Sequence, residues 1–115
     1  TVTYGYNPER HHKFLASLDI CGKKYDGSKG SPTVESLVCA GIKDGGVFNK
    51  RGEYMKEAVI QGLIDTISDP SRLEKGIEIY KKCHDEGVQS GAKGIEQTLV
   101  ISKCGLSIMP LLDKP

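Results

Sequence analysis

The sequence predicts an all-α protein, a compact bundle of five or six short helices around an apolar pocket, crosslinked by two disulfides. Three observations favour this fold class. Several segments begin with a capping residue followed by proline and continue with apolar residues at helical intervals. No stretch of any length shows the alternation typical of a β-strand. The four cysteines each lie near the end of a helical segment, where a bridge to a neighbouring helix forms readily.

The first two helices are expected in the N-terminal half, after an extended arm over residues 1–6. Asn7 followed by Pro8 is an N-cap followed by proline at the first helical position, and Gly22 is expected to end that helix. Ser31 followed by Pro32 is interpreted in the same way as the start of the second helix. Apolar residues then recur every four positions until the glycines at 45 and 46.

The third helix, residues 53–67, is the most apolar. Its apolar arc is too wide to be covered by one neighbour, which suggests contact on two sides or a face toward an internal cavity. A helical hairpin follows from Asp69 to Cys104, with Gly87 expected to close its first helix in the left-handed conformation. The tail, residues 105–115, is unusually apolar for a terminus, and we expect it to be buried, covering the pocket.

Length and charge narrow the possible functions. At 115 residues the chain is one domain, residues 1–115, with a single core. Sixteen basic and 15 acidic residues are spread evenly for a net charge of +1, which argues against nucleic acid and anionic membranes as main partners. No apolar run approaches the ~20 residues of a membrane span. The start at Thr1 rather than Met fits a secreted product without its signal peptide, or a trimmed fragment.

The four cysteines are the most informative part of the composition. They allow three pairings, of which the nearest in sequence, Cys21–Cys39 and Cys83–Cys104, is favoured over four free thiols in a cytosolic protein. Each closed loop would add about 3 kcal/mol of stability in the chain-entropy model. Two disulfides imply an oxidising, extracellular location.

Catalytic and metal-binding patterns are not recognised. Neither a Gly-x-Ser-x-Gly nucleophile motif nor a zinc-protease spacing is present, so we expect neither an enzyme nor a cofactor or metal. His11 and His12 point about 100° apart on a helix and are interpreted as exposed surface residues. His84 is expected to be cationic near a helix C-terminus, where the helix dipole favours positive charge.

The cysteine spacing resembles that of the insect odorant-binding and pheromone-binding proteins, in their four-cysteine branch. The resemblance covers residues 7–112 and rests on Gly-Gly-Val-Phe-Asn-Lys-Arg-Gly-Glu after Cys39, on Lys-Lys-Cys83 and on Lys-Cys104. The resemblance implies the same two disulfides, Cys21–Cys39 and Cys83–Cys104, that proximity in the sequence favours. The positions of the family's third bridge hold Glu35 and Ile95 here, as if a whole bridge were lost. The short interval from Cys21 to Cys39 departs from the family and predicts a pocket open on one side.

This resemblance implies an extracellular carrier of small lipophilic ligands such as an odorant, a pheromone or a fatty acid. Affinity would come from apolar burial, with a hydroxyl of Tyr54 or Tyr80 holding the polar end of the ligand. Two alternatives stay open: a salivary or haemolymph scavenger of host amines or lipids, and a secreted effector that binds another protein. A receptor and a homodimer are equally open. The residues expected to line the pocket are Phe14, Leu18, Val38, Phe48, Tyr54, Met55, Val59, Leu63, Ile77, Tyr80, Leu99, Ile108 and Met109.

Overall fold

The computed structural model describes residues 2–27 and 31–114 and confirms the predicted all-α class. None of its helices is both long and apolar enough to cross a bilayer. The described part of the chain folds into five α-helices and a final 3-10 helix: α1 (Pro8–Lys24), α2 (Val34–Asp44), α3 (Lys56–Thr66), α4 (Pro70–Gln89), α5 (Gly94–Gly105) and η1 (Leu106–Leu111).

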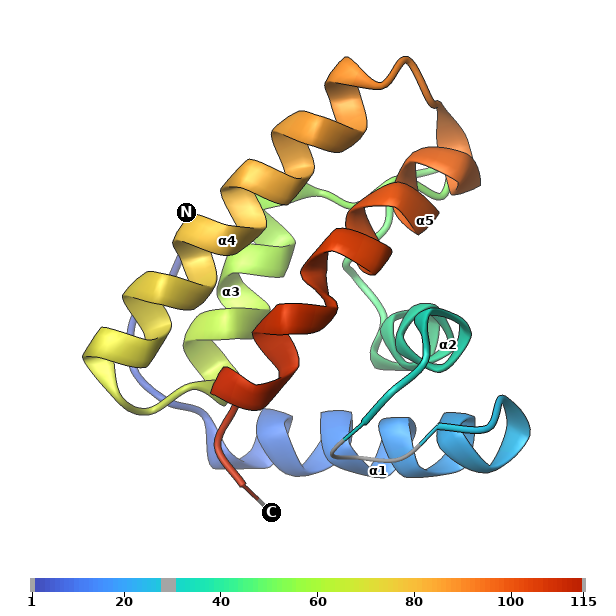
Figure 1. Cartoon of the computed structure of the whole chain (residues 1–115). Coiled ribbons are helices and arrows are strands. Elements are labelled where there is room, and N and C mark those ends of the chain that lie inside the picture. Colours follow the sequence, from blue (N-terminus) through green and yellow to red (C-terminus); the bar gives the residue numbers. More distant parts are fainter. Residues whose placement is uncertain (1, 28–30, 115) are drawn as a thin grey trace.

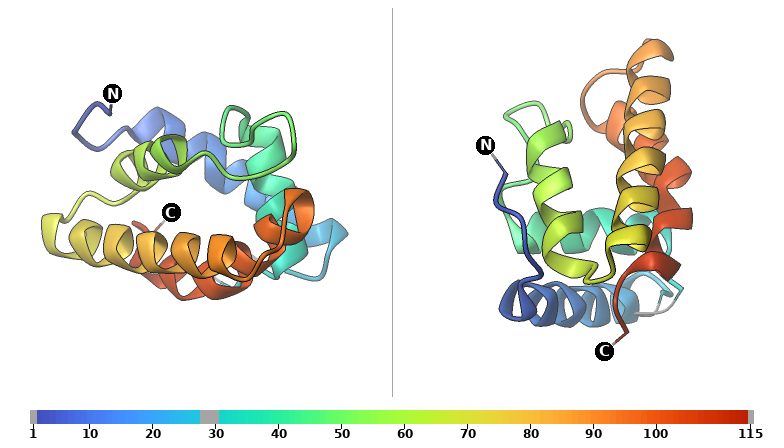
Figure 2. Two further views of the ribbon diagram at one scale, coloured as in Figure 1. Left: turned by 90° about the horizontal axis from the view of Figure 1, so that it is seen from above. Right: turned by 90° about the vertical axis from the view of Figure 1, so that its left-hand side faces the viewer.

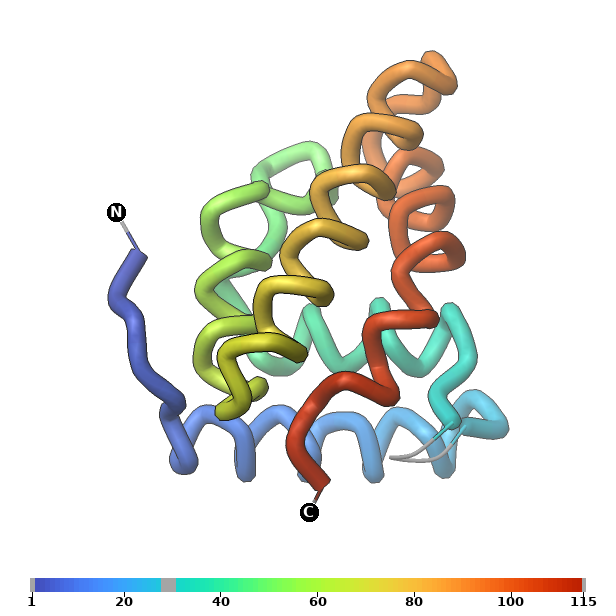
Figure 3. Tube along the Cα trace, turned by 60° about the vertical axis from the view of Figure 1, so that its left-hand side comes forward, coloured from blue at the N-terminus to red at the C-terminus, as the bar shows by residue number. Residues whose placement is uncertain are grey.

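The helices form a base and an upright group. Helix α1 lies across the base with α2 packed on it, while α3, α4 and α5 stand over them (Figure 1). Helices α4 and α5 run antiparallel as a hairpin, and α3 lies beside α4 (Figure 2). The tube view shows the C-terminal segment returning past the lower end of this group toward α1 (Figure 3).

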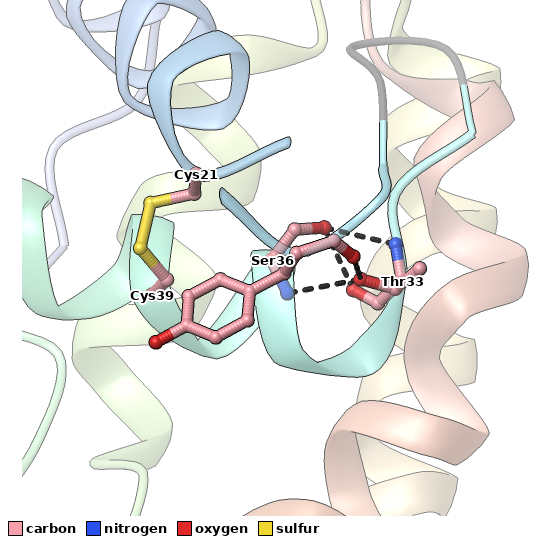
Figure 4. The surroundings of a disulfide bond; sticks show 5 residues. Cys21, Thr33, Ser36 and Cys39 are labelled. Carbon is pink, nitrogen blue, oxygen red and sulfur yellow. Dashed lines mark hydrogen bonds between the residues drawn. A yellow bond between two sulfur atoms is a disulfide. The ribbon is translucent and has the colours of Figure 1, made fainter. Parts of the chain in front are cut away.

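The predicted caps of α1 and α4 are confirmed. The Asn7 side chain accepts a hydrogen bond from the backbone N–H of Arg10 at 3.1 Å, and Asp69 caps α4 in the same way through Arg72 at 2.9 Å. Helix α2 begins later than predicted, because Thr33 rather than Ser31 is its N-cap. Thr33 and Ser36 cap each other reciprocally close to the Cys21–Cys39 bridge (Figure 4).

Two predicted helix ends are wrong. Helix α1 continues past Gly22 to Lys24, and α4 continues past Gly87 to Gln89, so Gly91 takes the left-handed conformation, with φ of 84°. Gly87 serves close packing instead: a Cβ placed there would lie 2.5 Å from Cγ1 of Ile101 on α5. Glycine therefore lets the two helices of the hairpin approach each other.

The segment between α2 and α3 is extended, not helical as predicted for residues 53–55. Phe48 and Tyr54 form an isolated antiparallel bridge, and their rings stack with centroids 4.8 Å apart. A turn at residues 49–52 joins them, with Gly52 at φ of 79° and the Asn49 side chain accepting from the backbone of Glu53 at 3.0 Å. This bridge fixes where the Tyr54 side chain points, and α3 begins only at Lys56.

Both predicted disulfides are present. Cys21–Cys39 joins α1 to α2, and Cys83–Cys104 joins the two helices of the hairpin. The larger core cluster lies among α3, α4, α5 and η1, and the smaller one lies between α1 and α2. Each crosslink therefore lies within one half of the molecule, and packing rather than a disulfide holds the two halves together.

The described segments near both termini, residues 2–7 and 112–114, are attached to the bundle. The N-terminal arm pairs with α3 through Thr3 and Gln61, and the hydroxyl of Tyr6 contacts Nδ1 of His11 at 2.6 Å. His11 is buried, which contradicts the expectation of an exposed residue. At the other end, Asp113 accepts from the hydroxyl of Ser68 at 2.6 Å, which holds the tail against the turn between α3 and α4.

Candidate functional site

A cavity that is partly open to solvent lies inside the bundle, where all five α-helices and the tail meet. Its volume is about 110 Å³, and its wall is mainly aliphatic and aromatic. The lining residues are Arg10, Phe14, Leu37, Gly41, Asp44, Val47, Tyr54, Val59, Gly62, Leu63, Thr66, Tyr80, Ile101, Ser102, Gly105, Ile108, Met109 and Leu112.

Seven of the predicted lining residues surround this cavity, and they come from five separate segments. The tail contributes two of them together with Leu112, so the tail forms part of the cavity wall. The seven residues are Phe14, Tyr54, Val59, Leu63, Tyr80, Ile108 and Met109.

The other six predicted residues lie elsewhere. Leu18 is fully buried in the small cluster between α1 and α2, and Ile77 packs against the main core cluster outside the cavity wall. Val38 and Phe48 line a separate surface groove beside α2. Met55 and Leu99 are exposed. Met55 precedes α3, and α5 turns Ile101, Ser102 and Gly105 toward the cavity instead of Leu99.

Sequence reasoning missed three kinds of lining residue: glycines, polar residues and four further apolar residues, Leu37, Val47, Ile101 and Leu112. Glycines 41, 62 and 105 line the cavity, and at position 41 an added Cβ would lie only 3.2 Å from the ring of Phe48. Polar residues of the wall, such as Ser102 and Arg10, lie on helices where only the apolar residues were considered as candidates for the cavity wall. The sequence feature that could have identified these glycines and polar residues is their position on helix faces that are otherwise apolar.

The polar groups deep in the wall are hydroxyls. Tyr54 and Ser102 share one hydrogen bond of 2.8 Å between their oxygens. Burial raises the pKa of Tyr54, although its bond to Ser102 acts in the opposite direction. The phenol therefore stays protonated and neutral at physiological pH.

Tyr80 differs from Tyr54 because its hydroxyl is paired with a ring nitrogen of histidine and not with a second hydroxyl. Its oxygen lies 3.0 Å from Nδ1 of His84, one turn along α4. Burial, and secondly the proximity of Tyr54, raise the pKa of Tyr80 far above its ordinary value. Burial also lowers the pKa of His84, assisted by the nearby positive charge of Lys56. The predicted cationic His84 at a helix end is therefore wrong: the residue lies inside α4 and its neutral form is favoured.

A charged group closes the opposite part of the wall. The Arg10 guanidinium donates to Asp44 at the end of α2 at 2.6 Å and to Asp65 near the end of α3 at 2.9 Å. Burial opposes the positive charge, but the hydrogen bonds and charges of the two carboxylates outweigh it, so the pKa of Arg10 is raised. The group combines one cation with two anions, with Asp65 also accepting from Gln61 at 2.9 Å.

These features define a class: a small disulfide-crosslinked helical protein with an apolar internal cavity and a few internal polar groups. In a comparison with protein families, residues 20–109 match the ant venom allergen Sol i 2 family. The match covers well over half of the chain, which therefore belongs to that family. Searches of curated proteins and of solved structures gave no match.

The sequence-based resemblance to the insect odorant-binding proteins is wrong as a family assignment. The family that matches is the venom allergen family. The resemblance relied on four cysteines and short flanking motifs, and the same two disulfides are compatible with a different family of helical proteins. The shortened interval from Cys21 to Cys39 was the departure that pointed away from it.

Proposed function

We propose that this protein is a secreted carrier that binds small, largely apolar molecules in its internal cavity and catalyses no reaction. The observation that carries the proposal is the cavity, whose wall is built from α1 to α5 and the tail. Burial of apolar surface would supply the affinity, at about 25 cal/mol per Å². Membership in a venom allergen family and the two disulfides support secretion.

The cavity volume limits the size of the ligand. An apolar protein cavity of roughly 150 Å³ accommodates benzene or xenon. At about 110 Å³, this cavity suits a molecule of about that size rather than a long fatty acid. The proposed ligand is therefore a small volatile or lipid fragment, unless the wall opens.

The Tyr54–Ser102 pair suits a ligand that carries one acceptor oxygen. The two hydroxyls have two donor protons, and their mutual hydrogen bond uses one. The other proton is available to a ketone, ester or alcohol oxygen within the cavity. Tyr80 is a weaker candidate because its hydroxyl is paired with His84.

The alternative functions fit the site less well. A scavenger of amines requires a carboxylate free to pair with an ammonium group, whereas Asp44, which lines the cavity, is already paired with Arg10 at 2.6 Å. An effector that acts through protein contacts alone does not need an internal hollow. A neutral lipophilic ligand is therefore the better-supported class.

The test compares two ligands of nearly equal shape, cyclohexanone and methylenecyclohexane, by isothermal titration calorimetry. We expect both molecules to bind the wild type. In the double variant Tyr54→Phe/Ser102→Ala, the dissociation constant of cyclohexanone should rise about fivefold relative to that of methylenecyclohexane, which corresponds to about 1 kcal/mol for one hydrogen bond. The double variant is needed because either hydroxyl alone retains a donor. Tyr80→Phe is the matched control and should leave the ratio unchanged. Failure of the folded wild type to bind either molecule would refute the carrier function.

A further inference from the structure

The internal cavity shares part of its wall with an outer groove. The groove has a volume of about 520 Å³ and lies over α1, the end of α2 and α3. Arg10, Asp44 and Val47 line both hollows. The remaining groove residues are Asn7, Glu9, Lys13, Gly45, Gly46, Ala58 and Gln61.

Two of the three shared wall residues, Arg10 and Asp44, are held by their ion pair, whereas Val47 is held by a backbone hydrogen bond that its carbonyl accepts from Met55 at 2.8 Å. The guanidinium of Arg10 reaches from α1 to Asp44 and Asp65, and it lies over Gly62, 3.5 Å from where a Cβ would be. Because position 62 has no side chain, the guanidinium itself covers this part of α3. Displacing the Arg10 side chain would therefore remove one part of the wall between the two hollows.

The backbone beside the ion pair offers room for such a displacement. Gly45 and Gly46 follow Asp44 directly, both with positive φ, of 78° and 76°, and with open space around them. The Arg10 side chain is 23% exposed, so it has a path toward solvent, whereas that of Asp44 is 5% exposed. Segments of small residues like this one absorb the backbone changes of opening motions.

We propose that the Arg10–Asp44 pair is a partition that sets the length limit of the ligand. This inference rests on the proposed carrier function. A ligand that fits the cavity binds behind the intact pair. A longer apolar chain binds only by separating the pair, and its far end then lies in the outer groove beside Val47. The pair is thus a specificity-determining element for chain length.

The proposal predicts a break in a homologous series. Each buried methylene should tighten binding about fourfold. For primary n-alcohols from butanol to dodecanol, affinity should rise at this rate until the cavity is full, at about six heavy atoms, and then level off. The levelling occurs because each longer chain must also separate Arg10 from Asp44.

Removing the pair should remove the break. In Arg10→Ala, affinity should rise without a break from butanol to dodecanol, so the ratio of dodecanol affinity to butanol affinity should be at least tenfold larger than in the wild type. Lys13→Ala is the matched control, since Lys13 is a cation that lines the outer groove but not the cavity. Its series should keep the wild-type break.

The readouts separate this proposal from the carrier function. If the wild type binds no alcohol, the carrier function is refuted. If the wild type binds alcohols but its affinity shows no break with chain length, or if folded Arg10→Ala keeps the wild-type break, only the proposed partition is overturned. Asp44→Asn, which leaves the Arg10–Asp65 pair in place, serves as a second variant if Arg10→Ala does not fold. In the wild type, the Nε–H NMR signal of Arg10 should shift with saturating dodecanol but not with butanol, and an equal response to both would also overturn the partition.

Discussion

A single methyl group at position 87 tests how tightly the hairpin is packed against the cavity. In Gly87→Ala the new Cβ would lie 2.5 Å from Cγ1 and 3.0 Å from Cδ1 of Ile101, which is 2% exposed. Alanine in a helix gains up to about 1 kcal/mol over glycine, whereas overpacking a core costs about 1–3 kcal/mol. Ile101 borders the cavity and can yield into it, so we expect a net loss of about 1 kcal/mol in the free energy of unfolding.

Gly62→Ala is the matched control for this prediction. Its added Cβ would meet nothing closer than 3.5 Å, so the helix preference should act alone and raise the free energy of unfolding by about 1 kcal/mol. Urea unfolding followed by far-UV circular dichroism measures both variants. Calorimetry should also show weaker cyclohexanone binding by Gly87→Ala, because the displaced Ile101 side chain occupies cavity space. If both alanines stabilise the protein equally, the close packing described for Gly87 is wrong.

Three further predictions concern the crosslinks, an acidic group and the tail. The variant Cys83→Ser/Cys104→Ser should lose about 3 kcal/mol of unfolding free energy in urea, and an unchanged midpoint would contradict the role of the bridge. The N–H of Gly94, and secondly the amide of Asn49, hold the pKa of Glu53 below its ordinary value. The ionised Glu53 carboxylate therefore stabilises the fold above the ordinary carboxyl pKa, and this stabilisation is lost as the pH falls through the lowered pKa. The urea midpoint of Glu53→Gln should accordingly depend less on pH than that of the wild type between about pH 2 and 5. Deleting residues 107–115 removes Ile108, Met109 and Leu112 from the cavity wall, so it should change ligand affinity or release rate in the same calorimetry, and an unaltered affinity would show that the tail does not matter to binding.

Local signals in the sequence were sufficient for much of the fold. Asn7 and Asp69, each followed by proline, marked the starts of α1 and α4 because a cap depends only on residues within one turn. The disulfides followed from locality, since each joins cysteines in neighbouring helices. Gly87 was misinterpreted because a glycine that ends a helix and one that admits a neighbouring helix are the same residue in the sequence.

The candidate site was less accessible to sequence reasoning because it is assembled over long distances. Arg10, Asp44 and Asp65 come from three different helices, and no local pattern indicates that they meet. His11 was assigned to the surface because its burial depends on contact with the N-terminal arm through Tyr6. Apolar spacing located several wall residues but could not fix the rotation of α5, and Leu99 was therefore chosen where Ile101 faces the cavity.

Crystals of the protein pressurised with xenon would test the internal binding site most directly. Xenon is apolar and small enough for a cavity of this size. We expect a xenon peak in contact with Leu63, Ile101 and Met109, inside the wall that the helices and tail form. A cavity filled by its own side chains, or xenon found only in the surface groove beside α2, would contradict this expectation.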